Sequence, residues 1–271
     1  MRYRLTIAYD GTAFHGWQRQ FVGSPDDHPD TKRPELRTVQ SVVAEAIRNV
    51  VREPIELVGA SRTDSGVHAR AQTAAFTTTD TRLGPPDERL MLAINSQLPD
   101  DVIITACART RDDFNPIRDC MSKGYRYLLW TGRDRPLWER NLVHHIWMQL
   151  DEVAMHDAAQ VLVGEHDFAA FAAANHGRDS TVRTIHACTV TRLDEHQIAI
   201  DVSGNGFLYN MVRIIAGTLV EVGRTKMDVF HVERALASLD RRNAGPTLPP
   251  TGLCLMWMEY PEPDGFVGEK P

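Results

Sequence analysis

The segment GASRTDSGVHARAQTAAF, residues 59–76, carries the densest group of reactive side chains in the sequence: Arg62, Asp64 and His68. A free Asp has a pKa of about 4 and is therefore a carboxylate near neutral pH. The Ser-Gly pair after Asp64 favours a turn that allows close backbone approach. The carboxylate is thus a nucleophile, a general base or only the brace of the loop. Because no second carboxylate lies nearby in the sequence, a two-carboxylate glycosidase pair is not indicated.

A second group lies in GNGFLYNMVRIIAGT, residues 204–218. Its Gly204 and Gly206 are not followed by a third glycine at position 209, so the segment fails the pattern of a dinucleotide-binding loop. As a helix, the segment places Arg213 away from its apolar stripe. This arginine either faces solvent or is held against an anion across a groove, with Gly217 allowing a close neighbour. Both interpretations stay open at this point.

A third group is SKGYRYLLW, residues 122–130, which has the composition of a strand. Tyr125 and Tyr127 lie on one face of such a strand, while Arg126 points to the other face. Paired aromatic side chains on a strand pack in a core or stack on bases in sheet-based nucleic-acid binding modules. The histidines at His144, His145 and His166 lack the spacing of a zinc motif, so ordinary hydrogen-bonding roles are favoured and no metal site is expected.

Charge alone does not favour a nucleic-acid ligand, because 30 basic and 36 acidic residues give a net charge of −6. Binding depends on where positive charge gathers, however. Basic side chains gather between residues 109 and 126, at Arg109, Arg111, Arg118, Lys123 and Arg126. This group is either a solvated surface or a contact for phosphates.

The order of the elements predicts an α+β protein. Strands are predicted at 3–9, 55–60, 71–78 and 102–109, with helices at 39–50 and 88–98. The second half is predicted to contain strands at 124–130, 183–193, 197–203 and 252–260, with helices at 151–164, 207–223 and 227–239. Residues 21–37 are expected to form a long surface loop. Two α+β halves are expected to meet near residue 110 and to share one continuous sheet.

The 271-residue sequence contains no stretch of about 18 uninterrupted apolar residues, so no membrane span is expected. The first residues lack the apolar core of a secretory signal. The four cysteines, Cys107, Cys120, Cys188 and Cys254, are far apart and without CxxC spacing. Reduced thiols and a cytoplasmic location are therefore expected.

Seven blocks, in this order, resemble the tRNA pseudouridine synthase A family: YDGTAFHGWQRQ, TVQSVV, SRTDSGVHARAQ, KGYRY, HDFAAF, GNGFLYNMVRIIAGTLVEVGR and AGPTLPPTGLCL. The resemblance extends from end to end. It implies the pseudouridine synthase fold, in which two ferredoxin-like, RRM-like α+β halves join their antiparallel sheets into one sheet flanked by helices. It implies isomerisation of uridine in the anticodon stem-loop of tRNA at positions 38, 39 and 40. It also implies a homodimer that needs neither a metal nor an organic cofactor.

The resemblance assigns roles to individual residues. Asp64, in the domain 1–110, matches the essential aspartate of the family, and Arg62 belongs to the same motif. Tyr125 and Arg213, in the domain 111–271, match the active-site tyrosine and the arginine that pairs with the aspartate. Either Leu253 or Leu255 is expected beside the target base. The basic residues closest to Tyr125 are the expected RNA contacts: Arg118, Lys123 and Arg126.

Three departures from the family pattern concern substrate contacts. Ser61 stands where most relatives have Gly, and FNPI at 114–117 replaces a common FHAR and its basic side chain. Arg118, one position later, would point to the opposite face of an extended segment. The loop at 21–37 is longer than a minimal member needs. Two rival functions are a catalytically silent RNA-binding protein on this scaffold and an Asp-nucleophile phosphotransferase, which would require a DxD pair that Asp64 lacks.

Overall fold

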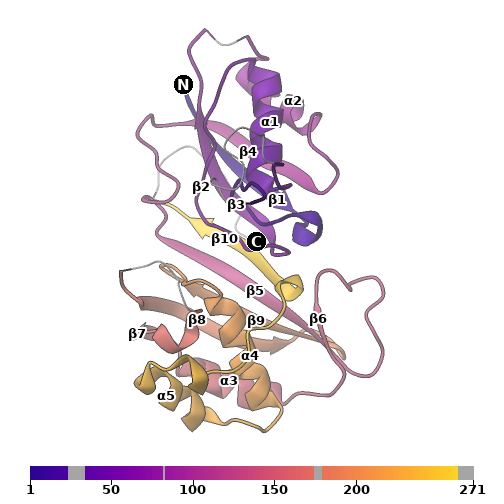
Figure 1. Cartoon of the computed structure of the whole chain (residues 1–271), viewed down its shortest axis with the longest axis vertical. Coiled ribbons are helices and arrows are strands. Elements are labelled where there is room, and N and C mark those ends of the chain that lie inside the picture. The colour runs from indigo at the N-terminus through magenta and orange to yellow at the C-terminus, as the bar shows by residue number, and fades with distance from the viewer. Residues whose placement is uncertain (24–33, 82, 174–178, 262–271) are drawn as a thin grey trace. The chain divides into compact units, whose positions relative to one another are not determined.

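The computed structural model describes residues 1–23, 34–81, 83–173 and 179–261. Its contacts divide the chain into two compact units, shown in Figure 1. Unit 1 contains Met1–Cys120 and the chain from Tyr260 onward, and unit 2 contains Met121–Glu259. The predicted domain division near residue 110, with its functional assignment, stays a prediction. Each unit is described by itself.

Unit 1 is built in the order β1 (Arg2–Tyr9), α1 (Val39–Val51), β2 (Val58–Gly59), β3 (His68–Thr77), α2 (Asp87–Asn95) and β4 (Val102–Thr110). Its strands are antiparallel in the order β4-β1-β3, with β2 paired to β3. The predicted order of strands and helices in this half is confirmed. Strand β2 is much shorter than the predicted 55–60.

Helix α1 shows why the sequence folds as it does in unit 1. Thr38 is the N-cap, and its hydroxyl accepts a hydrogen bond from the backbone N–H of Ser41, which completes a capping box. Val39, Val43 and Ile47 recur at helical spacing and are fully buried. α1 packs against α2, and α2 packs against β4. Of the predicted loop 21–37, Phe21 and Glu35 form an isolated β-bridge, whereas residues 24–33 lie outside the described part.

Unit 2 contains β5 (Ser122–Thr131), β6 (His144–Ile146), α3 (Glu152–Gln160), β7 (Gly164–Asp167), β8 (Val182–Arg192), β9 (Gln197–Gly204), α4 (Met211–Gly223), α5 (Val229–Ser238) and β10 (Leu253–Glu259). The antiparallel strand order within this unit is β10-β5-β9-β8-β7, and β6 adds to β5 in parallel. Both units therefore confirm the α+β class. That their sheets join into one stays a prediction.

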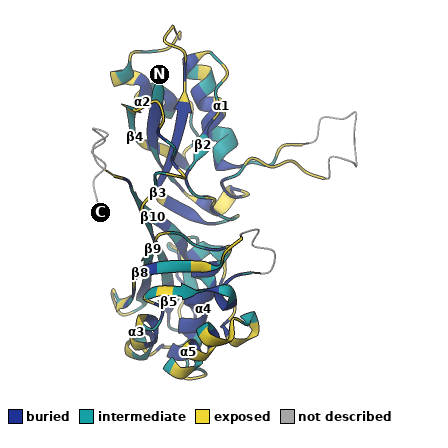
Figure 2. Cartoon of the chain, turned by 90° about the vertical axis from the view of Figure 1, so that its left-hand side faces the viewer, coloured by how far each residue is buried: buried dark blue, intermediate teal, exposed yellow. Residues whose placement is uncertain are grey.

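Helix α4 is the central helix of unit 2, and Figure 2 colours it largely as buried. Arg213 and Glu221 are its only residues that are not buried. The prediction of a helix from residue 207 was wrong at its start: α4 begins at Met211, because Asn210 has left-handed backbone angles (φ 61°, ψ 5°). The predicted helix 151–164 also ends early, at Gln160, and Gly164 (φ 112°) begins β7.

No helix in the described ranges is both long enough and apolar enough to cross a membrane.

Candidate functional site

The loop that carries Asp64 connects β2 to β3 and is held from one side by the segment after β1. The backbone N–H of Trp17 donates to the carbonyl of Thr63 at 3.0 Å, and the N–H of Gly66 donates to the carbonyl of Phe14 at 3.3 Å. The hydroxyl of Ser65 donates to the same Phe14 carbonyl at 3.2 Å. Asp64 is half-buried, and Arg62 is exposed. The loop is thus fixed mainly by backbone contacts to the segment after β1.

Two glycines allow this segment to approach the Asp64 loop so closely. A Cβ at Gly11 would lie 2.1 Å from the carbonyl oxygen of Val67. A Cβ at Gly16 would lie 2.7 Å from the carbonyl oxygen of Thr63, and Gly16 has a φ of 83°, which other residues rarely adopt. The block YDGTAFHGW therefore supports the loop by direct backbone packing.

His68 occupies a buried position at the start of β3. Its Nδ1 accepts a hydrogen bond from the N–H of Gly11 at 3.0 Å and lies 3.2 Å from Oδ1 of Asp10. Burial raises the pKa of Asp10, but hydrogen bonds from Thr12 and the nearby His68 outweigh burial, so this pKa is lower than usual. His68 ties the end of β1 to the loop, which is a structural role.

The departure at Ser61 does not strain the loop. Ser61 is absent from the residues with positive φ in the described chain, so its backbone does not need glycine. Its N–H donates to the side-chain oxygen of Gln72 at 3.2 Å, and the amide of Gln72 donates back to the Ser61 carbonyl at 2.6 Å. Two hydrogen bonds between the Ser61 backbone and the Gln72 side chain therefore hold the start of the loop against β3.

In unit 2, Tyr125 and Tyr127 lie on one face of β5, as predicted, and both are buried. Leu255 of β10 is directly opposite Tyr125, and Leu253 is opposite Tyr127. Directly opposed residues share a face of the sheet, so both leucines lie on the tyrosine face. Phe207 meets the Tyr125 ring edge-on, with centroids 5.3 Å apart. Leu255 is thus the cross-strand apolar neighbour of Tyr125, whereas the role predicted for one of the two leucines stays a prediction.

Arg213 also belongs to the tyrosine side of unit 2. Burial raises the pKa of Tyr127 far above its usual value, and the positive charge of Arg213 opposes that rise. The Tyr127 hydroxyl donates to the carbonyl of Pro249 at 2.7 Å. Arg213 donates from Nε to the carbonyl of Leu248 and from Nη1 to Oδ1 of Asn210, each at 2.7 Å. Its guanidinium is therefore held at the C-terminal segment that leads into β10.

The predicted basic group is largely paired with carboxylates. Arg126 makes a two-pronged salt bridge to Asp201, at 2.8 and 3.0 Å. Arg118 and Arg111 both contact Asp119, and their charges, with the Asn115 N–H, hold the pKa of that carboxyl well below its usual range. Arg109 is paired with Asp87. Lys123 is half-buried on β5. Phosphates would therefore have to compete with these carboxylates.

The FNPI departure forms a turn, so the expected extended segment at 114–117 is wrong. The side-chain oxygen of Asn115 accepts from the N–H groups of Ile117 and Arg118, at 2.9 and 3.1 Å. In this turn Phe114 is buried and Arg118 is exposed. The argument that Arg118 must point to an opposite face therefore does not apply.

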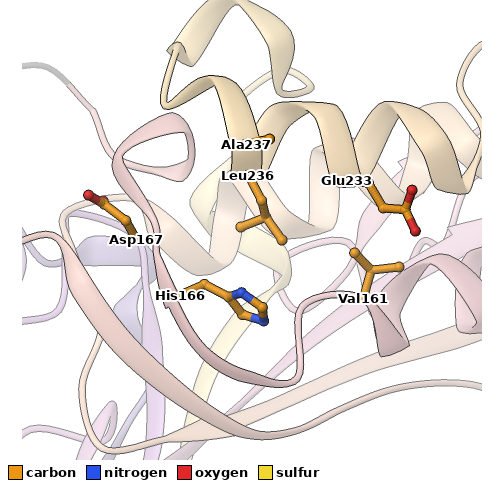
Figure 3. A pocket seen from close by; sticks show the side chains of 6 residues that line it. All are labelled: Val161, His166, Asp167, Glu233, Leu236 and Ala237. Atoms are coloured by element: carbon orange, nitrogen blue, oxygen red, sulfur yellow. The ribbon is translucent and has the colours of Figure 1, made fainter.

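A 350 Å³ pocket, drawn in Figure 3, lies between the β7 region and α5, and its lining side chains are Val161, His166, Asp167, Glu233, Leu236 and Ala237. It contains the His166 of the HDFAAF block. β7 is three strands from β5 in the sheet, or about 14 Å at the usual strand spacing. The pocket is therefore well separated from Tyr125. No group of three or more His, Cys, Asp or Glu side chains in the described ranges is arranged to hold a metal ion.

The structure thus gathers Tyr125, Leu253, Leu255 and Arg213 on the tyrosine side of unit 2, while Asp64 and Arg62 lie in unit 1. The contact expected between Asp64 and Arg213 stays a prediction. Sequence reasoning missed the first of two supports, the segment 10–17 behind the Asp64 loop; it placed Asn210 on the side of Arg213 but gave that residue no role. The paired glycines of YDGTAFHGW were the available signal for the first support.

Comparisons with known proteins agree with this arrangement of motifs. A family model described as tRNA pseudouridine synthase matches residues 158–261. The chain is 40% identical to tRNA pseudouridine synthase A 2 of Clostridium perfringens (strain 13 / Type A), over 95% of this chain and 98% of the relative. It is 40% identical to tRNA pseudouridine synthase A of Ruminiclostridium cellulolyticum and 41% identical to that of Pelobacter propionicus, with the same coverage.

Proposed function

The chain belongs to the tRNA pseudouridine synthase A family, and from this membership we propose that it converts uridine to pseudouridine at positions 38, 39 and 40 of the tRNA anticodon stem-loop. It is an isomerase. The observation that carries the proposal is 40% identity to a relative of this name over 95% of the chain. The family motifs that hold Asp64, Tyr125 and Arg213 are all present. We place this activity in the cytoplasm.

The reaction rearranges one nucleotide without a net change of atoms. The N1–C1′ bond breaks, the uracil rotates, a C5–C1′ bond forms, C5 loses its proton and N1 gains one. A base inside a stem must first leave its stack, at a cost of a few kcal/mol. Stacking on an aromatic ring returns about 1–3 kcal/mol per base. We assign this stacking to Tyr125, with Leu255 as its apolar neighbour.

Asp64 is the proposed catalytic carboxylate. It either attacks C1′ and forms a covalent intermediate, or removes the C2′ proton so that uracil leaves by elimination. Both routes require the ionised form. We propose that Arg213 pairs with Asp64 in the working enzyme, because a nearby cation keeps a partly buried carboxyl ionised. The Tyr125 hydroxyl, directly or through a water molecule, then accepts the C5 proton.

Binding of tRNA requires contacts to phosphates, which make affinity depend on salt. We propose that Arg62, Arg118, Lys123 and Arg126 make such contacts. Arg118 and Arg126 would exchange carboxylate partners for phosphates, since both are partly exposed and salt-bridged. Affinity for tRNA should therefore fall steeply between low and moderate salt. Affinity that does not change with salt would contradict this part of the proposal.

We further propose that the enzyme is a homodimer. Support comes from large apolar side chains exposed in and beside the β5–β6 connection of unit 2: Leu137, Trp138, Leu142 and Trp147. Trp138 is 85% exposed, which is unusual for so large an apolar ring and typical of an interaction surface. Light scattering should report twice the chain mass for the wild type. Trp138→Lys should shift that mass towards the monomer.

The first test is tritium release from C5-labelled uridine in an unmodified tRNA transcript, with no metal added. The wild type should release tritium, and Asp64→Asn should release none while still binding tRNA. Asp157→Asn, at an exposed position on α3, is the matched control and should be fully active. Tyr125→Phe should bind tRNA but retain tritium, because C5 then keeps its proton after the new bond forms.

The outcomes separate the rival functions. Binding of tRNA without tritium release by the wild type would favour a silent RNA-binding protein. Turnover without added magnesium would dispose of the phosphotransferase, because phosphoryl transfer needs the metal and breaks no C5–H bond. Full tritium release by Tyr125→Phe would leave stacking as the only role of that side chain.

A further inference from the structure

Asn210, immediately before α4, has a backbone conformation that its sequence position does not explain. Its φ of 61° lies in the left-handed region, which is unfavourable for most residues with a Cβ but is adopted readily by Gly and occasionally by Asn. Asn at a helix N-cap usually accepts a hydrogen bond from a backbone N–H of the first turn. Asn210 makes no such capping bond. The Asn210 side chain makes a different contact.

That contact is with Arg213. The Oδ1 atom of Asn210 accepts a hydrogen bond from Nη1 of Arg213 at 2.7 Å, one helical turn along α4. Arg213 and Glu221 are the only residues of α4 that are not buried, so the guanidinium is at the open side of an otherwise enclosed helix. Asn210 thus presents its acceptor to the one arginine of this helix.

A second acceptor, the carbonyl of Leu248, holds another nitrogen of the same guanidinium. Nε of Arg213 donates to it at 2.7 Å, and the N–H of Leu248 donates to the Arg213 carbonyl at 3.3 Å. The segment before Leu248 is fixed on α4 by two glycines. A Cβ at Gly217 would lie 1.9 Å from the carbonyl oxygen of Pro246, and the N–H of Gly245 donates to the Thr218 hydroxyl at 2.8 Å. The Leu248 carbonyl therefore has little freedom to move.

Bonds to both Nε and Nη1 fix the plane of a guanidinium, because its N–H groups form a rigid fork. A free arginine side chain samples many rotamers, and the entropy of ordering it would otherwise be lost when it meets its target. Holding the arginine in place beforehand removes that cost from the reaction step.

We propose that Asn210 is a positioning residue, whose function is to hold Arg213 in one orientation for the anion that it meets during catalysis. The inference rests on the proposed function, in which that anion is the Asp64 carboxylate. It goes further by giving a function to the Asn210 side chain, which a Gly at this position would lack. Asn210 contacts neither substrate nor reacting atoms in this proposal; it acts through Arg213.

The test is Asn210→Gly, which keeps the left-handed backbone accessible and removes the side chain that carries the acceptor. We expect kcat, measured as single-turnover tritium release, to fall about tenfold, as is typical for loss of a hydrogen bond to a charged group. The Kd for tRNA and the Tm should stay at or above wild-type values. Leu239→Gly is the matched control, because Leu239 has a similar φ of 57° at the end of α5. Its kcat should equal that of the wild type.

Two further measurements distinguish positioning from a general structural effect. In an Arg213→Lys background, Asn210→Gly should lower kcat no further, because the fork that it orients is absent. An equal tenfold loss in that background, or a wild-type kcat for Asn210→Gly alone, would overturn the inference.

The second measurement does not need activity. In ¹⁵N NMR of arginine-labelled protein, hindered rotation should give Arg213 separate Nη1 and Nη2 signals, assigned by their absence in Arg213→Lys. These signals should merge in Asn210→Gly, and signals that stay separate would overturn the inference. The wild type could release no tritium while the Arg213 signals are separate in the wild type and merge in Asn210→Gly. That result would refute the proposed function and leave the positioning of Arg213 supported.

Discussion

The phenolic oxygen of Tyr9 and the hydroxyl oxygen of Thr63 lie 2.7 Å apart in a buried hydrogen bond. Tyr9 ends β1, and Thr63 is the residue before Asp64. The bond thus ties the end of a core strand to the loop that presents the proposed catalytic carboxylate. Because both residues are buried, neither hydroxyl can exchange its partner for water without opening the fold.

Tyr9→Phe should lower the free energy of unfolding by about 1–3 kcal/mol, because it leaves the buried Thr63 hydroxyl without this partner. Thr63→Val removes the other hydroxyl. The double variant should lose less stability than the sum of the two single variants, since the bond can be lost only once. Urea denaturation monitored by Trp fluorescence measures all three values. Strictly additive losses would contradict a direct coupling.

Gly16→Ala should lower kcat, because the new Cβ disturbs the Asp64 loop as well as the backbone at residue 16. The new Cβ would need a positive φ and would also lie 2.7 Å from the Thr63 carbonyl, so the Asp64 loop must move. Gly164→Ala is the matched control, since Gly164 also has a positive φ but its Cβ would meet only His166 Nε2, at 3.5 Å. We expect kcat to fall about tenfold or more for Gly16→Ala and to stay near wild type for Gly164→Ala. Equal kcat values for both variants would show that the loop tolerates the shift.

Much of the fold was predictable because its elements have regular hydrophobic periods. The alternation in β9 (Ile198, Ile200, Val202) and the helical spacing in α1 both gave the correct element type. The start of α4 was not predictable by periodicity, since Phe207 and Leu208 continue the apolar pattern of the helix. The chain departs from the helix there because Asn210 adopts a left-handed conformation, and its side chain then contacts Arg213, three residues further along the chain.

The candidate site was predictable only in part, and for a similar reason. Motifs identified Asp64, Tyr125 and Arg213 because each is a reactive residue in a distinctive block. They could not show that Arg126 is paired with Asp201, since those two residues are adjacent only through the register of β5 and β9. They also could not show that Gly11 and Gly16 pack against the Asp64 loop, because backbone contacts between distant segments leave no periodic signal.

Asp119 should make the stability of the protein depend on pH in the acid range. Hydrogen bonds from Arg118 and the Asn115 backbone, with Arg111, lower the pKa of Asp119 in the folded state. A carboxyl with a lowered folded-state pKa stabilises the fold above its unfolded pKa of about 4, and this contribution is lost as the pH falls towards the folded-state pKa. Asp119→Asn should therefore lower the urea midpoint at pH 6 and show a smaller loss of stability on acidification. The same slope in both proteins would contradict this role.

Arg213→Met tests the proposed pairing with Asp64 through the pH dependence of kcat. A cation within about 4–6 Å lowers the pKa of a carboxyl by about 1–3 units, because it favours the charged form. Removing the cation should raise the pKa of Asp64, so a larger fraction of the enzyme is protonated at any given acidic pH. The acid limb of the kcat profile should then move to higher pH by about one unit or more. Arg213→Lys, which keeps a positive charge but loses the fork, should shift the limb less.

The control for this experiment is Arg242→Met, which removes an exposed arginine of the same unit that is paired with Asp240. Its kcat profile should overlay that of the wild type, because the exposed side chain is screened by solvent and salt. An acid limb that stays in place in Arg213→Met would mean that Arg213 does not set the ionisation of the catalytic carboxylate. In that case Asn210 and Leu248 would orient Arg213 towards a phosphate of the substrate. Arg213→Met would then raise the Kd for tRNA and leave kcat unchanged.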